Sequence, residues 1–112
     1  VVKGLKANVF DLLSELVNNK SREYDFIILD PPAFTKSGST VKNAIRGYKE
    51  INLKAMKLLP RGGYLATCSC SHFMKEELFV QMLTPMYSCG RSRRASSRLT
   101  IRFYGMSRRR II

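Results

Sequence analysis

The chain has 112 residues, of which 45% are hydrophobic, and 20 Lys and Arg against 8 acidic residues give it a net charge of +12. This length allows one domain at most, and the composition is that of a globular protein. Because there is no secretion signal, no apolar run near the ~20 residues of a membrane span and an odd number of cysteines, we expect a cytoplasmic protein with reduced thiols and no disulfide framework.

Strands and helices alternate along the first part of the chain. β-branched residues at both ends of Val1–Val9 predict a short strand, and Phe10–Asn18 follows as a helix with apolar residues on one face. The continuous apolar run Phe26–Leu29 predicts a strand buried on both faces, which an aspartate and two prolines end. Because the first residue is valine, we also expect the chain to begin inside a longer protein.

The same alternation continues after the proline pair. Small polar residues predict a loop over 36–40, and Val41–Leu59 has the spacing of a long amphipathic helix whose other face is cationic. Proline and a glycine pair end this helix, Tyr64–Cys70 is the next strand and Lys75–Leu83 begins another helix. The order predicts an α/β domain with a doubly wound parallel sheet.

Two predicted strands end in residues that carry chemistry, Asp30 and Cys70. Ligands of open α/β sheets lie beyond the carboxyl ends of the strands, so neighbouring strands would bring both residues to one rim. A thiolate there can add to C6 of cytosine while a protonated acid hydrogen-bonds N3, which makes C5 nucleophilic enough to take a methyl group. The plainer alternatives are that Asp30 begins a turn and that each cysteine is a small buried hydrophobe. No metal site is expected, because Cys68 and Cys70 are closely spaced and His72 is the only histidine.

Three motifs with the right order and spacing resemble those of a known family. They are Asp30-Pro31-Pro32-Ala33-Phe34, Arg46-Gly47-Tyr48-Lys49-Glu50-Ile51-Asn52-Leu53 and Thr67-Cys68-Ser69-Cys70-Ser71-His72. From Val1 to about Leu83, the chain resembles the bacterial class I S-adenosylmethionine-dependent methyltransferases that make 5-methylcytosine in large-subunit ribosomal RNA. The resemblance implies a partial Rossmann-like sheet of parallel strands with flanking helices. The family's first two strands and its glycine-rich cofactor loop are missing, so we expect this chain to be inactive alone.

The resemblance also implies a role for individual residues. Cys70 would be the nucleophile, whereas Cys68 would be structural, and Asp30 would lie between the S-adenosylmethionine cofactor and the target base. Asn8, which replaces the family's usual aspartate, and Phe10 would bind the cofactor. The remaining implied contacts are with ribosomal RNA: Pro31 and Pro32 would shape the base pocket, Phe34 would stack on an extruded base, and Lys36, Arg46 and Lys49 would contact phosphates. A solvated helix face is the alternative for these cations, and the oligomeric state does not follow from the sequence.

The resemblance stops near Thr84, where the charge also changes. Residues 1–83 carry twelve Lys and Arg against eight acids, a net charge of +4, whereas residues 84–112 carry eight Arg, no Lys and no acid. Permitted codons for Arg98 to Gly105, read from the third base, encode the family's Thr-Asp-His-Pro-Ile-Leu-Trp segment. We therefore interpret 1–83 as the carboxyl-terminal portion of a methyltransferase domain and 84–112 as an out-of-frame or disordered Arg/Ser-rich tail, which resequencing the gene would test.

Two other functions fit parts of this pattern. The Asp-Pro-Pro-x-Phe motif also occurs in methyltransferases that modify amino groups or other bases without covalent catalysis. The excess of cations fits a noncatalytic basic RNA-binding module, for which the arginines after residue 90 would be a real arm. Methylation without the Cys70 thiol would favour the first alternative over covalent catalysis. RNA binding without cofactor binding would favour the second alternative.

Overall fold

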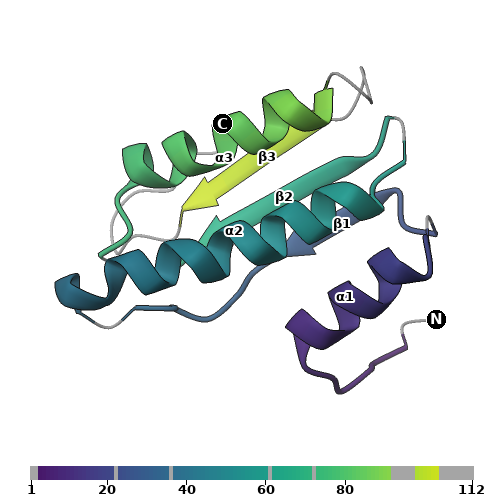
Figure 1. Ribbon diagram of the computed structural model, residues 1–112, viewed down its shortest axis with the longest axis horizontal. Helices are drawn as coiled ribbons and strands as arrows, with labels where there is room; N and C mark the ends of the chain where they lie inside the picture. The colour runs from purple at the N-terminus through teal and green to yellow at the C-terminus, as the bar shows by residue number, and fades with distance from the viewer. Residues whose placement is uncertain are drawn as a thin grey trace.

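The computed structural model describes residues 3–21, 23–35, 37–60, 62–71, 73–91 and 98–103. Its elements are, in chain order, α1 Val9–Asn18, β1 Phe26–Leu29, the 3-10 turn η1 Gly38–Thr40, α2 Val41–Leu58, β2 Tyr64–Ser69, α3 Glu76–Arg91 and β3 Arg98–Phe103. The strands form one sheet in the order β1-β2-β3, and both neighbouring pairs run parallel (Figure 1). The α/β class and the parallel sheet are as predicted, and they are compatible with a methyltransferase fold.

Helix α2 is the centre of the packing, and it connects β1 to β2 (Figure 1). Its apolar residues recur every three or four positions, so one face of the helix is buried. The buried residues are Ala44, Tyr48, Ile51, Asn52, Ala55 and Leu58. The carboxyl-terminal half of this face packs with Leu13 of α1 and with the strands, whereas Tyr48 and Ala44 pack with Phe79 and its neighbours on α3. Gly62, at φ 79°, then supplies the left-handed backbone of the turn into β2.

The two faces of the sheet differ, and this corrects one expectation. Leu29 of β1 and Leu65 of β2 are buried in the cluster that α1 and α2 form, whereas Phe26 and Ile28 are 57% and 65% exposed. Tyr64, which is in register with Phe26, is exposed on the same side. The prediction that Phe26–Leu29 is buried on both faces was therefore wrong, because helices in the described part of the chain cover only one face.

The predicted strand at Val1–Val9 is also wrong over its described residues. Residues 3–8 are exposed and outside any strand, and α1 begins at Val9. Asn8 explains this start, since its side-chain Oδ1 accepts a hydrogen bond from the backbone N–H of Phe10 at 2.9 Å. A side-chain acceptor at this position satisfies one of the free amides of the first turn. Asp11 adds a negative charge in the same turn.

Replacing Asn8 by alanine is expected to lower the free energy of unfolding by about 1 kcal/mol, because the first turn loses its cap. Urea denaturation followed by circular dichroism measures this difference. Asn8→Asp keeps the acceptor and serves as the matched control, with an unfolding midpoint at or above that of the unsubstituted chain. A loss of equal size in both variants would contradict a capping role.

The second half of α3 and all of β3 lie in the segment 84–112, which we interpreted as a tail. Helix α3 continues from Glu76 through Pro85 to Arg91, and β3 pairs with β2 from Tyr64↔Arg98 to Ser69↔Phe103. The described residues of 84–112 are in a helix and a strand, and the interpretation of 84–112 as an out-of-frame or disordered tail stays a prediction. The boundary near residue 83 also stays a prediction.

Candidate active site

Asp30 and Cys70 lie together, as the strand order predicts. They follow β1 and β2 directly, and the register pairs Leu29 with Thr67, so both strands end at the same edge. The Cys70 thiol donates a hydrogen bond to the carbonyl oxygen of Pro31, with 3.7 Å between sulfur and oxygen. Asp30, Pro31, Pro32 and Cys70 line an open pocket of about 510 Å³. The sequence prediction placed these four residues in one site, and the structure brings all four together.

A second link joins the two loops behind this pocket. The Ser71 hydroxyl donates to the carbonyl oxygen of Thr35 at 3.2 Å, and it accepts from the backbone N–H of Phe73. The Thr35 hydroxyl in turn donates to the carbonyl oxygen of Ser37 at 2.6 Å, and its oxygen lies 2.6 Å from the hydroxyl oxygen of Thr40, at the start of α2. Sequence analysis assigned no role to these hydroxyls. Their signal was the group of serines and threonines between residues 35 and 40, together with the serine that follows Cys70.

Phe34 is an anchor for the loop that carries Asp30. Its half-buried ring packs edge-on against Tyr48, with 4.6 Å between ring centroids, and lies 5.9 Å from the ring of Phe10. These contacts hold the loop against α2 and against the start of α1. Stacking of Phe34 on an extruded base stays a prediction, and it would use the part of the ring that these contacts leave open.

Gly47 lies directly under the Phe34 ring in the middle of α2. A Cβ atom added at Gly47 would meet Cδ2 of Phe34 at 3.4 Å, an ordinary van der Waals distance. Because glycine inside a helix costs roughly 0.5–1 kcal/mol relative to alanine, Gly47→Ala is expected to stabilise the chain by up to that amount. Thermal or urea unfolding measures the change. A lower unfolding midpoint would show that the Phe34 ring cannot tolerate the methyl group.

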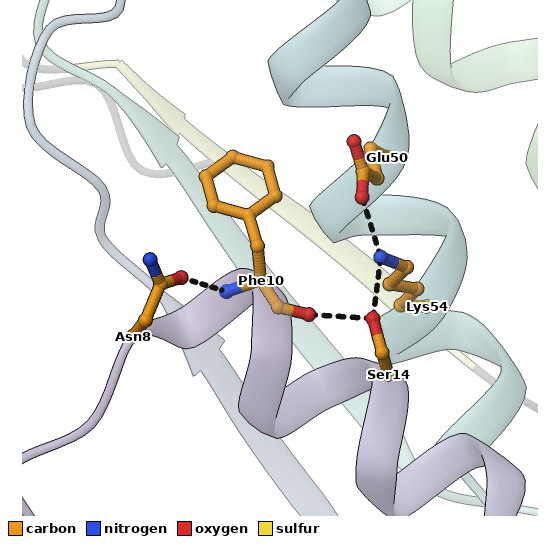
Figure 2. A network of polar contacts seen from close by, with 5 residues as sticks. All are labelled: Asn8, Phe10, Ser14, Glu50 and Lys54. Atoms are coloured by element: carbon orange, nitrogen blue, oxygen red, sulfur yellow. Dashed lines mark hydrogen bonds and ion pairs between the residues drawn. The ribbon is translucent and has the colours of Figure 1, made fainter.

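Two of the three residues expected to bind the cofactor, Asn8 and Phe10, lie at the start of α1 in a polar network that Figure 2 shows, whereas the third, Asp30, lines the pocket. Asn8 accepts from the Phe10 N–H, and the Ser14 hydroxyl donates to the Phe10 carbonyl at 2.6 Å. Lys54 of α2 donates to the Ser14 hydroxyl at 2.7 Å and forms an ion pair with Glu50. The network joins α1 to α2, and the Phe10 ring places the start of α1 beside the Asp30 loop through Phe34.

The cations expected to contact RNA are only partly placed. Arg46 and Lys49 are exposed on α2, and Lys36 lies outside the described residues.

Among the described residues, no group of three or more His, Cys, Asp and Glu side chains is arranged to hold a metal ion. None of the helices described is long and apolar enough to cross a bilayer.

The site has the geometry of an α/β protein that binds its ligand beyond the carboxyl ends of parallel strands. The chain is 43% identical over 79 residues to ribosomal RNA large subunit methyltransferase I of Vibrio vulnificus, and 44% identical over 78 residues to that of Shewanella denitrificans. The Aeromonas salmonicida protein of the same name is 43% identical over 79 residues. The matches cover 70% of this chain and 19% or 20% of the relatives, so the chain spans about a fifth of their length. No model of a protein family matches the chain. The names of these relatives describe methyltransferases of large-subunit ribosomal RNA.

Proposed function

We propose that the chain is part of a cytoplasmic methyltransferase that transfers a methyl group from S-adenosylmethionine to C5 of a cytosine in large-subunit ribosomal RNA. The observation that carries this proposal is the Cys70 thiol beside Asp30 and the two prolines in one open pocket. A sulfur nucleophile and a carboxyl group at one ligand site are the two groups that methylation of a pyrimidine carbon requires.

Each residue of the pocket has a step in this reaction. The Cys70 sulfur forms a bond to C6 of the cytosine, while the Asp30 acid donates a hydrogen bond to N3 and stabilises the electron pair that moves onto the ring. When bound, S-adenosylmethionine supplies the methyl group that C5 takes up. Solvent water in the open pocket then accepts the proton from C5. The electron pair of that C–H bond re-forms the C5=C6 double bond and expels the Cys70 sulfur from C6, so the aromatic ring and the thiolate are restored. Pro31 and Pro32 form the rigid wall against which the base lies.

The residues at the start of α1 fit one part of the cofactor. Asn8 Oδ1 already accepts from the Phe10 N–H, but a carbonyl oxygen has a second lone pair for an adenine amino group. Asn8 and Phe10 would hold the adenine side of S-adenosylmethionine, and Asp30 would hold its methyl side. The sequence contains no Gly-x-Gly-x-x-Gly loop that could bind the remainder of the cofactor.

A chimera tests the proposed function. The 79 matched residues of the Vibrio vulnificus relative are replaced by the corresponding segment of this chain, and the chimera is expressed in a Vibrio vulnificus strain that lacks the gene for the relative. We expect 5-methylcytosine in the large-subunit RNA, detected by bisulfite sequencing and by mass spectrometry of nucleosides. Methylated bases other than 5-methylcytosine would instead favour the amino-group or other-base alternative. A folded chimera that binds the RNA but adds no methyl group would favour the noncatalytic module.

A further inference from the structure

Tyr48 is a fully buried residue in the middle of α2 that contacts the two segments on which the pocket residues lie. Its side chain is 0% exposed. The Tyr48 hydroxyl accepts a hydrogen bond from the Ser69 hydroxyl at 3.2 Å, and Ser69 is the last residue of β2, directly before Cys70. The Tyr48 ring contacts Phe34, two residues after the proline pair, with 4.6 Å between centroids.

The position of Tyr48 is itself fixed from two directions. Phe79 of α3 packs edge-on against the Tyr48 ring, with 5.3 Å between centroids and 87° between planes. One turn further along α2, the side-chain amide of Asn52 donates to the Tyr48 carbonyl oxygen at 2.8 Å. Tyr48 is therefore held by the helices, and it contacts the two site segments through different groups, the hydroxyl and the ring.

The direct link from Cys70 to Pro31 is weaker than the buried link through Tyr48. The bond from Cys70 to Pro31 uses a thiol, a weak donor, at an exposed position. A hydrogen bond inside the protein is electrostatically stronger than one in contact with water. Thus the end of β2 and the Asp30 loop owe their relative position to buried contacts, which are the Ser71 hydrogen bond to the Thr35 carbonyl and the two contacts of Tyr48.

We propose that Tyr48 is a positioning residue, which fixes the Cys70 thiol relative to the Asp30 loop through its hydroxyl on Ser69 and its ring on Phe34. The catalytic consequence of this inference rests on the proposed function, whereas the position of the thiol does not. Tyr48 touches neither substrate nor cofactor in this role.

The 112-residue chain itself allows the first test. The rate of iodoacetamide alkylation at Cys70 is measured by mass spectrometry of the Cys70 peptide at constant pH, for Tyr48→Phe, Ser69→Ala and the double variant. Tyr48→Phe keeps the ring and removes only the hydroxyl. Because the end of β2 loses its anchor, we expect the rate to rise about threefold or more in each single variant and no further in the double variant, as for two partners of one interaction.

Tyr64→Phe is the matched control, since it removes a phenol hydroxyl from an exposed tyrosine at the opposite end of β2. Its alkylation rate should equal that of the unsubstituted chain. Far-ultraviolet circular dichroism confirms that each variant is folded. Rates for folded Tyr48→Phe and Ser69→Ala that match the control, or increases that multiply in the double variant, would overturn the inference.

The chimera defined above gives the second test. Misplacement of a reacting group by about 1 Å can cost up to about a hundredfold in rate, so we expect Tyr48→Phe to lower kcat about tenfold with KM for the RNA unchanged. Tyr64→Phe should leave both constants unchanged. An equal kcat for the two variants would refute the catalytic consequence. If the unsubstituted chimera makes no 5-methylcytosine, the proposed function fails, and the alkylation rates still decide the positioning role.

Discussion

Replacing Cys70 by alanine is expected to abolish methylation by the chimera, with a fall in rate of at least about a thousandfold. The reason is chemical, because C5 of cytosine is a poor nucleophile until a sulfur bonds to C6. Cys70 is exposed at the pocket and its thiol reaches the Pro31 carbonyl, so alanine removes the reacting atom without opening a buried cavity. Tritium transfer from labelled S-adenosylmethionine to large-subunit RNA measures the rate.

Cys68→Ala is the matched control for this experiment. Cys68 lies two residues earlier, within β2, and is buried, and it plays no part in the proposed chemistry. Its removal is expected to cost stability and to leave methylation within about tenfold of the unsubstituted chimera. Retained methylation in Cys70→Ala would refute covalent catalysis, and it would favour a methyltransferase that uses Asp30 and the prolines alone.

Replacing Tyr48 by alanine is expected to lower the free energy of unfolding by about 3–5 kcal/mol, the usual cost of removing a buried aromatic ring. The ring is 0% exposed and packs against Phe34 and Phe79. The variant also leaves the buried Ser69 hydroxyl without its acceptor, which adds to the cost. Because small domains are stable by only about 5–15 kcal/mol, much of the cooperative urea transition should be lost.

Tyr64→Ala controls for the general effect of removing a tyrosine. Its ring is partly exposed on the uncovered face of the sheet, where it stacks on Phe26 with 6.1 Å between centroids. We expect a loss of about 1 kcal/mol or less. Similar losses in both alanine variants would contradict the buried packing of the Tyr48 ring against Phe34 and Phe79.

The middle of the chain could be predicted well from local patterns. Strand β1, helix α2 and strand β2 lie within one residue of the predicted ranges, because periodicity and the proline and glycine residues between them define each element. The start of the chain was predicted wrongly. Its β-branched residues favoured a strand, but Asn8 followed by Asp11 is a capping signal, and a strand also needs a neighbour to pair with.

The pocket was predictable because it depends on one rule, that parallel strands end at a common edge. The residues that support it were not predictable in the same way. Ser69 and Tyr48 are 21 residues apart, and Ser71 and Thr35 are 36 apart, so no local pattern reveals these hydrogen bonds. The burial of Phe26 and Ile28 depends on what covers the second face of the sheet, which is not a property of the strand's own sequence.

The uncovered face of the sheet determines how the purified chain should behave in solution. Phe26, Ile28 and Tyr64 form an exposed hydrophobic surface on a molecule with a net charge of +12. Repulsion between like charges opposes the association of two copies, whereas burial of this surface favours it. At about 0.1 M salt the Debye length is only about 10 Å, and it falls to about 3 Å at 1 M. The purified chain should therefore aggregate as the ionic strength is raised, which turbidity measures, and it should stay in solution in buffer of low ionic strength.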